Sequence, residues 1–470
     1  MIRTFLLSAT SVAALSLSVT GASACTLDAL TLTCSATHGG FSQATPGLVI
    51  VVEGGASVTA SGRAMDLTGA DQTVRNAGTV QSTGNDAIRS SGPNLRVEND
   101  GEILADGRGI RLRNDADGAT IVNGTSGVIR TTNRGIASEN DDLIENVTVE
   151  NHGIIESANA RALQLRGPGT TVINHGTMTG AEEVIEARIG FTLENHGSIV
   201  LKDGVADEDG VQFASGRVMN WGLIQGSDDG VDVDEGTIWN YATGQIISKP
   251  AASDTAREGN AIDADVLLQD PAIDEASQVN AGLLKIVNAG LIRGPRAISG
   301  AAGRTGGIEV HNSGTLEGTD TAAIDFALSM AGSLVKLSGD SEVIGSVLMT
   351  DNDDTVKIGA LTSGKLLSNI ADDMFAVFDG RGGNDTVHLD GYSLADILWL
   401  TARGNTAVLN LATAGGNVLG TFVNFEFWKV GDTTYTTEEL AALAPIPVPA
   451  GLPLLGAGLG VLWVLRRRRS

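Results

Sequence analysis

The sequence has few aromatic residues, few cysteines and too few basic residues to balance its acidic ones. Aromatic residues make up 4% of the 470 residues, and the formal net charge is −25. No zinc-type Cys/His spacing, phosphate-binding loop, nucleophile elbow or basic aromatic patch is present. The absence of these motifs excludes the enzyme classes that depend on them. Because the chain is so acidic, we expect no nucleic-acid partner.

Glycine and small aliphatic residues are abundant instead. The chain has 61 glycines and is 42% hydrophobic, so it is too apolar to be disordered. Such a composition suits a chain that turns often and buries a core of small and branched aliphatics.

Residues 1–24, at the N-terminus, have the features of an export signal. Arg3 precedes an apolar stretch, and Ala22-Ser23-Ala24 has the small-x-small pattern of a signal peptidase site. The alternative is a lipoprotein acylated at Cys25, but the residue three before that cysteine is Ala22 instead of the usual leucine.

Cys25 and Cys34 are the two cysteines of the chain, and export would take them to an oxidising compartment. We expect a disulfide between them that adds ~2–3 kcal/mol and holds an N-terminal cap, residues 25–46, against fraying. Two free thiols are the alternative.

The C-terminus carries an apolar segment, residues 449–465, followed by Arg466, Arg467, Arg468 and Arg469. A helix of this length, ~25 Å, would just cross a bilayer with the arginines in the cytoplasm. Pro447 and Pro449 would keep the preceding peptide extended.

The motif Ile446-Pro447-Val448-Pro449-Ala450, the apolar segment and the arginine cluster resemble the VPLPA variant of the PEP-CTERM sorting signals. The resemblance covers residues 446–470 and implies processing by an exosortase-like enzyme, with delivery to the outer membrane, the cell surface or an extracellular matrix. A plain membrane anchor is the alternative. Removal of both terminal signals would change the formal charge from −25 to −30.

An Asn-x-Gly motif followed by aliphatic residues recurs about every 23 residues, which predicts a solenoid. The motif begins at Asn76, Asn99, Asn151, Asn174, Asn195, Asn220, Asn288 and Asn312, with looser copies at Asn123 and Asn240. The gap between Asn240 and Asn288 is twice the usual step and is interpreted as two coils. Stacked asparagines would contribute ~1 kcal/mol for each satisfied hydrogen bond.

A second motif follows most of these asparagines, as in Gly109-Ile110-Arg111-Leu112. Strand alternation points Ile110 and Leu112 inward and Arg111 outward. Each coil therefore has at least two strands, and the expected fold is an all-β, right-handed parallel β-helix with about 16 coils of ~20–25 residues. We assign residues 47–340 to coils, 341–437 to the final coils and a cap, and 438–448 to a linker.

The repeated coils resemble the β-helical passenger domains of autotransporters, and the segments that begin at Asp351, Asp379 and Phe422 resemble the final coils and cap of such passengers. No membrane-barrel sequence follows Tyr435, so the sorting signal would have to replace self-translocation.

The segment Gly380–Val387 is similar to a calcium-binding nonapeptide in which Arg381 replaces one glycine. Consecutive copies normally supply the several oxygen ligands that calcium needs. One good copy and a degenerate one at Asp354 favour a capping turn. Calcium remains a weak alternative, and no other cofactor is expected.

The outward position of the second motif becomes acidic along the chain, at Glu186, Asp232, Asp263 and Asp325. Asp232 and Asp263 would lie one coil apart, ~5 Å, which is the carboxylate spacing of retaining glycoside hydrolases. Exposed acidic residues that discourage aggregation are the simpler interpretation of this stripe.

His152, His175 and His196 occupy one register in consecutive coils, so their rings would stack at ~4.8 Å. We interpret them as turn residues, with a metal-binding ladder as the alternative.

The sequence therefore predicts an exported structural or adhesion protein without catalytic activity, a rigid acidic rod that would contribute to biofilm or bind polysaccharide or a cell surface. The alternative is an extracellular polysaccharide lyase or hydrolase on the same fold, and fold alone does not decide between them.

Overall fold

The computed structural model describes residues 24–444 except 139–142, 252–258, 266–281, 363–365 and 370–375. The expected leader and the expected sorting signal, with its 449–465 segment and arginine cluster, lie outside the described residues. Among those described, no helix has the length and apolar character needed to cross a membrane.

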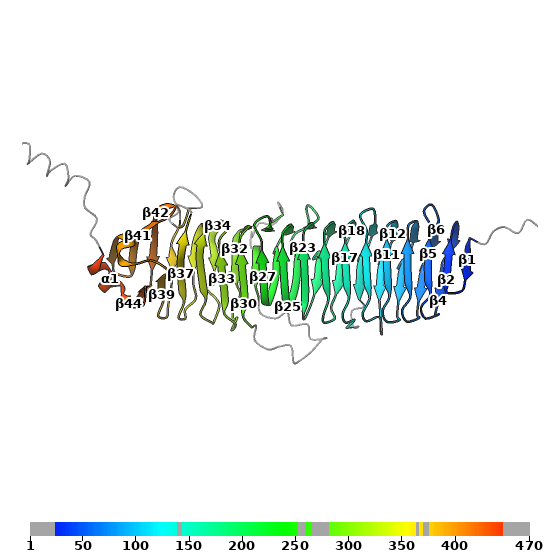
Figure 1. Ribbon diagram of the computed structural model, residues 1–470, viewed down its shortest axis with the longest axis horizontal. Helices are drawn as coiled ribbons and strands as arrows, with labels where there is room; N and C mark the ends of the chain where they lie inside the picture. The colour runs from blue at the N-terminus through cyan, green and yellow to red at the C-terminus, as the bar shows by residue number, and fades with distance from the viewer. Residues whose placement is uncertain are drawn as a thin grey trace, which may run out of the picture.

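The body is an elongated, mostly parallel β-solenoid of about 12 turns, with coil stacked on coil along one axis (Figure 1). The expected all-β parallel fold is confirmed. Regular coils contain three strands, one more than the two motifs indicated, and the coils beyond β34 are less regular. The expected number of about 16 coils is not confirmed.

Three ladders of parallel strands run along the solenoid. The first ladder consists of β2 (Thr31–Cys34), β5 (Val49–Val52), β8 (Thr73–Asn76), β11 (Arg96–Asn99), β14 (Thr120–Asn123), β17 (Thr148–Asn151), β20 (Thr171–Asn174), β23 (Phe191–Asn195), the second halves of β25 (Val211–Asn220) and β27 (Val231–Asn240), β30 (Leu284–Asn288), β33 (Ile308–Asn312), β35 (Leu334–Gly339), β37 (Thr355–Leu361), β39 (Thr386–Leu389) and β43 (Phe427–Val430).

The second ladder consists of β3 (Thr37–Gly39), β6 (Ser57–Ala60), β9 (Thr79–Ser82), β12 (Glu102–Ala105), β15 (Val128–Thr131), β18 (Ile154–Ser157), β21 (Thr177–Gly180), β24 (Ser198–Leu201), β26 (Leu223–Gly226), β28 (Gln245–Ser248), β31 (Leu291–Gly294), β34 (Thr315–Asp325) and β36 (Glu342–Leu348).

The third ladder consists of β4 (Phe41–Gln43), β7 (Met65–Leu67), β10 (Ile88–Ser90), β13 (Ile110–Leu112), β16 (Ile136–Ser138), β19 (Leu163–Leu165), β22 (Ile185–Ala187), the first halves of β25 and β27, β29 (Asn260–Ala264), β32 (Arg296–Gly300), the ends of β34 and β36, and β38 (Phe378–Asp379).

Alternate residues of each strand point into a single continuous core. Val74, Val97 and Ile121 are stacked in register and have no exposed surface. Parallel pairing gives the backbone amides their partners in the next coil, so every interior coil is stabilised on both sides.

The asparagines at the end of the first ladder form one buried row from Asn76 to Asn312, which also includes Asn123 and Asn240. The Nδ2 atom of each donates a hydrogen bond to the Oδ1 atom of the next over 2.7 to 2.9 Å. Because none of the ten is more than 2% exposed, these bonds satisfy groups that would otherwise be costly to bury.

The interpretation of two coils between Asn240 and Asn288 is wrong. Strand β27 pairs directly with β30, which places these two asparagines in adjacent coils. Strand β29 is the third strand of the coil that contains Asn240, and it pairs with β27 and β32. One enlarged coil therefore occupies the length of two.

Antiparallel strands lie at both ends of the solenoid, although at the N-terminus they cover the first ladder alone. At the N-terminus, β1 (Cys25–Asp28) pairs with β2, and a disulfide joins Cys25 to Cys34. The C-terminal cap contains a short 3-10 helix, antiparallel strands and one α-helix. Its elements are the 3-10 helix Leu394–Asp396, β40 (Ile397–Arg403), β41 (Thr406–Thr413), β42 (Gly416–Val423), β44 (Thr433–Thr436) and α1 (Thr437–Leu443).

Candidate functional site

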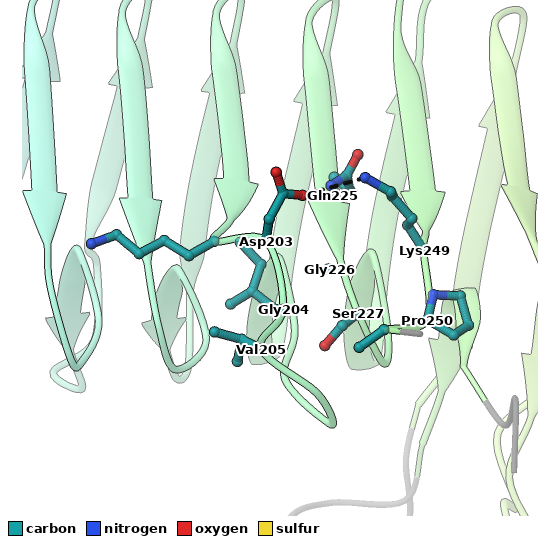
Figure 2. A pocket seen from close by; sticks show the side chains of 11 residues that line it. Asp203, Gly204, Val205, Gln225, Gly226, Ser227, Lys249 and Pro250 are labelled. Atoms are coloured by element: carbon teal, nitrogen blue, oxygen red, sulfur yellow. Dashed lines mark hydrogen bonds and ion pairs between the residues drawn. The ribbon is translucent and has the colours of Figure 1, made fainter. Parts of the chain in front are cut away.

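A hollow between neighbouring coils lies where β24, β26 and β28 end (Figure 2). Lys249 Nζ lies 3.4 Å from Asp203 Oδ1, and the side chains are 63% and 93% exposed. An ion pair this exposed contributes little to stability, and no other acidic side chain lines the hollow. The hollow therefore offers little chemistry.

A second face, along the third ladder, carries most of the buried charge, and we call it the charged face. Its central row is formed by residues paired in register: Asp66, Arg89, Arg111, Ala137, Gln164, Glu186, Gln212, Asp232, Asp263, Ser299 and Asp325. A flanking row, three residues earlier in each coil, includes Arg108, Arg134, Arg161, Asp209 and Asp229. The face is rich in arginine in the N-terminal coils and acidic in the later ones.

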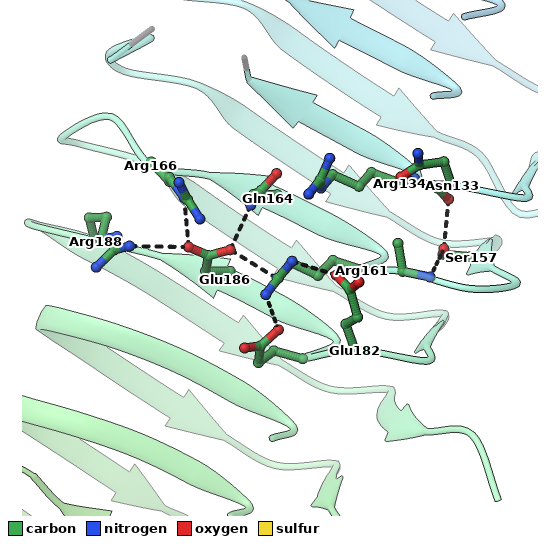
Figure 3. Close-up of polar contacts among 11 residues, drawn as sticks. Asn133, Arg134, Ser157, Arg161, Gln164, Arg166, Glu182, Glu186 and Arg188 are labelled. Atoms are coloured by element: carbon green, nitrogen blue, oxygen red, sulfur yellow. Dashed lines mark hydrogen bonds and ion pairs between the residues drawn. The ribbon is translucent and has the colours of Figure 1, made fainter. Parts of the chain in front are cut away.

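Glu186 lies at the centre of an ion-pair network in the arginine-rich part (Figure 3). Its carboxylate accepts from Arg166 Nε at 2.6 Å and from Gln164 Nε2 at 2.7 Å. The guanidinium groups of Arg161 and Arg188 lie 2.9 and 3.4 Å away. Burial alone would raise the pKa of Glu186, but the Arg166 hydrogen bond and the Arg161 and Arg166 charges outweigh it and lower the pKa.

The expectation of an exposed acidic stripe is wrong for Glu186 and Asp232, which are 2% and 7% exposed. Asp263 and Asp325 are half-buried. Strand alternation correctly indicated that these acidic side chains point away from the core. Long side chains of the same face nevertheless surround Glu186, and Gln212 donates a hydrogen bond to Asp232 Oδ2 at 3.0 Å. Pointing away from the core is therefore not the same as facing solvent.

The later coils contain a group of carboxylates that we call the acidic cluster: Glu208, Asp209, Asp228, Asp229, Asp232 and Asp263. Oxygens of Asp209, Asp228 and Asp229 lie within 4.8 Å of one another. Asp209 Oδ1 accepts from the Asp229 backbone amide at 3.1 Å, and Asp229 Oδ1 accepts from the Asn260 amide at 2.7 Å. Two of these carboxylates thus also fasten neighbouring coils.

Burial is the main cause of raised pKa values in the acidic cluster. It raises the pKa of Asp209 to about 8, and with the Glu183 charge it raises that of Glu208 to about 7. The pKa of Asp263 rises to about 7 through burial and the Asp265 charge, and that of Asp232 is also raised. At neutral pH the cluster thus retains protons that exposed carboxylates would have lost.

Asp232 and Asp263 are direct partners in the ladder, so their backbones are about 4.8 Å apart. Two adjacent carboxylates can act as general acid and general base when one is protonated and the other is not. Burial raises the pKa of both Asp232 and Asp263. The charge of Arg296 lowers the pKa of Asp263 against the effect of burial. The pair therefore has the residues for such chemistry.

Four other arginines of the charged face were not singled out from the sequence. Arg134, Arg161, Arg166 and Arg188 lie just before or after the second motif in their coils. The signal for Arg134 and Arg161 was the recurrence of a charged residue directly before the small-aliphatic pair, as in Arg134-Gly135-Ile136, whereas Arg166 and Arg188 directly follow the strand.

The three histidines of the predicted stack lie at the turn after the asparagine row. Ring centroids are 4.8 Å apart for His152 and His175 and 4.7 Å apart for His175 and His196. Trp221 and Tyr241 continue the stack at 4.4 and 4.1 Å. Among the described residues, the one group spaced to hold a metal is Asp209, Asp228 and Asp229, which contains no histidine.

The nonapeptide-like segment places its carboxylates against backbone amides. Asp385 Oδ1 accepts from the Asp354 amide at 2.8 Å, and Asp354 Oδ1 accepts from the Ser333 amide at 2.6 Å. Burial raises the pKa of Asp385 to about 7 and that of Asp354 to about 6. These two carboxylates fasten successive coils near the C-terminal cap.

In comparisons with protein-family models, with curated proteins and with solved structures, nothing matches this chain. Its function has to be inferred from its own geometry.

Proposed function

We propose that the chain is an exported structural or adhesion protein that presents a rigid acidic β-solenoid at the cell surface or in an extracellular matrix. The observation that carries this proposal is a rod with antiparallel strands at both ends. Antiparallel strand β1 covers β2 in the first coil, and the antiparallel strands β40 to β42 cover the last coils, whereas β3 and β4 of the first coil pair only with the coil that follows. A capped rod of this kind is suited to hold side faces away from an attachment point.

The proposed route depends on the terminal signals. The leader at residues 1–24 supports export, and the motif at Pro447, Pro449 and Ala450 supports processing by an exosortase-like enzyme and delivery to the outer surface. In finer detail we propose a right-handed β-helix of about 16 coils with a C-terminal sorting helix at 449–465.

Cell fractionation with C-terminal mass spectrometry of the native protein tests this proposal. The expected result is a protein in the outer membrane, on the surface or in the matrix that has lost the arginine cluster. An inner-membrane protein that retains Arg466 to Arg469 would refute the proposed route. A variant in which Pro447 and Pro449 are both replaced by alanine should remain unprocessed, since the recognised motif is then destroyed.

A second candidate function is the processing of an extracellular polysaccharide, and the Asp232–Asp263 pair favours it. Both carboxylates lie in one row, and both have raised pKa values. A screen of the purified protein on neutral and acidic polysaccharides tests this candidate. Turnover that is lost in Asp232→Asn and retained in Asp432→Asn, an exposed control, would support an enzyme; absent turnover would refute it.

A further inference from the structure

Asp232 is a buried carboxylate with one oxygen that lacks a hydrogen-bond donor. The residue is 7% exposed, and among the described residues its side chain accepts only from Gln212, at Oδ2. The next residue of the central row, Asp263, also lacks a donor, because its Oδ1 atom is buried without a partner. Buried acceptors are normally paired, since leaving them unpaired is costly. The two missing donors therefore require an explanation.

Both carboxylates act on Asp229, which lies in the flanking row. After burial, the charge of Asp263 has the largest effect on the pKa of Asp229, and the charges of Asp209, Asp228 and Asp232 follow. Asp229 is 7% exposed, and among the described residues its side chain accepts a hydrogen bond at Oδ1 alone. The carboxylates of the acidic cluster therefore converge on this residue.

Negative charge dominates the interior of the acidic cluster. The charges with the largest effects on the pKa values of Asp209, Asp229 and Asp232 all belong to other acidic residues. Arginine charges lower the pKa values of Glu208 and Asp263, but burial outweighs them. Burying several like charges together is costly unless a cation or bound protons neutralise them.

Three of these carboxylates have the spacing of a cation site. Oxygens of Asp209, Asp228 and Asp229 lie within 4.8 Å of one another. Two Ca–O bonds span about 4.6–5.2 Å, whereas two Mg–O bonds span about 4.2 Å, so this spacing suits calcium better. A set of ligands that consists of oxygen alone also favours calcium over zinc or copper.

The three carboxylates can be reached by an ion from solvent. Asp209 and Asp229 are 8% and 7% exposed, and Asp228 is half-buried. The hollow of Figure 2, with a volume of about 210 Å³, lies beside them, since Ser227 lines it and directly precedes Asp228 in the chain. A single ion needs no cavity larger than the space between its ligands, so this exposure is sufficient.

We propose that Asp209, Asp228 and Asp229 bind one calcium ion. Asp209 and Asp229 each use Oδ1 to fasten the next coil, which leaves Oδ2 for the ion. Water molecules would complete the set of about six to eight oxygen ligands that calcium takes. Such a water would donate hydrogen bonds to the unpaired oxygens of Asp232 and Asp263. The ion would thus supply both the missing positive charge and the missing donors.

A calcium ion at this place would join three successive coils. Asp209 belongs to the coil of Asn195, the other two ligands belong to the coil of Asn220, and Asp263 belongs to the enlarged coil that follows. The ion would therefore stabilise the rod where its regular repeat is interrupted. The inference goes beyond the proposed function and does not depend on where the chain is delivered.

Calorimetric titration of the purified full chain with calcium chloride tests the proposal. The titration is done at about 150 mM salt, which screens diffuse attraction between the cation and the acidic chain. We expect saturable binding with a Kd of ~0.01–1 mM and at least about tenfold weaker binding of magnesium. Absence of calcium binding, or equal affinity for magnesium, would refute the site.

Two aspartate variants provide the matched comparison. Asp229→Asn removes the charge of one ligand and should weaken calcium binding at least about tenfold. Its remaining side-chain oxygen can still accept from the Asn260 amide, so the variant should fold. Asp203→Asn makes the same change in the coil of Asp209, at a side chain that is 93% exposed, and it should leave calcium binding unchanged.

Equal weakening by both variants would mean diffuse attraction of cations and would overturn the site. Calcium binding of full affinity in Asp229→Asn would place the ion elsewhere, such as the nonapeptide-like segment, and would also overturn it. Melting curves give a second readout and show that each variant is folded. Calcium should raise the melting temperature of the wild-type chain and of Asp203→Asn above that in chelator, but not that of Asp229→Asn. An unchanged wild-type melting curve would mean that bound protons alone neutralise the cluster, and the proposal would fail.

Discussion

Asn240 donates its side-chain amide to Asn288 Oδ1 at 2.8 Å, although 48 residues separate them in the chain. The bond has the same geometry as those between asparagines about half as far apart. The buried row therefore continues without a break past an enlarged coil. Stacking requires only that each coil return to the same register, and the length of its loops is free to vary.

Replacement of one buried asparagine should destabilise the rod. Asn174→Ala removes the bond to Asn195 Oδ1 and leaves Asn151 Nδ2 without its 2.8 Å acceptor. We expect a loss of roughly 2–4 kcal/mol in the free energy of unfolding, measured by urea denaturation. Asn417→Ala, at an exposed position in β42, should change it by less than about 0.5 kcal/mol. Equal effects of both changes would mean that the buried row does not stabilise the fold.

The acidic cluster should make the fold less stable as the pH rises. Folded Asp209 has a pKa of about 8 and folded Asp263 one of about 7, above the ordinary 3.8. The folded chain thus binds more protons than the unfolded chain, so this stability is fully present below about pH 4 and is lost through pH 7–8. Between pH 5 and pH 8, in the presence of a chelator, the melting temperature should fall.

Asp232→Asn should reduce that fall, because it removes one charge from the cluster. Asp432→Asn is the control at an exposed position and should not change the pH dependence. A melting temperature that rises between pH 5 and pH 8 in the wild-type chain would contradict the buried, protonated cluster.

Removal of the Glu186 carboxylate should take a shared partner from Arg161, Arg166 and Arg188, although Arg161 keeps its ion pairs with Glu182 and Glu183. For Glu186→Gln we expect a loss of roughly 3–5 kcal/mol, because breaking a buried ion pair leaves uncompensated charge. Glu98→Gln alters a more exposed pair with Arg75 and Arg96 and should cost less than about 1 kcal/mol. Chemical denaturation of both variants measures the difference, and similar losses would rule out a special role for the buried network.

Reduction of the Cys25–Cys34 disulfide should loosen the first coil alone. The bond closes a short loop between β1 and β2, and each interior coil is held by its own neighbours. Hydrogen exchange should become faster in residues 25–34 and remain unchanged in β17. Faster exchange throughout the rod after reduction would show that the bond has a global role.

The asparagine row could be predicted from the sequence because a single residue type that recurs at a fixed interval directly indicates stacking of that residue from coil to coil. The first-ladder strand of each coil, such as β11 (Arg96–Asn99), was missed because the repeated motif begins only at the last residue of that strand. The enlarged coil was misread because a doubled interval has the same length as two regular coils, and only the β27–β30 register distinguishes them.

Burial of the charged face was harder to predict from the sequence. Alternation gives the direction in which Glu186 points, but its exposure depends on the reach of Arg161, Arg166 and Arg188 from neighbouring coils. Such features require side-chain positions in three dimensions.

The coil register also bears on how the length of this rod would change during evolution. Because the backbone and the asparagine of one coil contact only the adjacent coils, duplication of a segment such as 152–174 would add one more layer of about 4.8 Å. The capped ends would keep their contacts. Reach from the attachment point could thus be adjusted one layer at a time by unequal recombination.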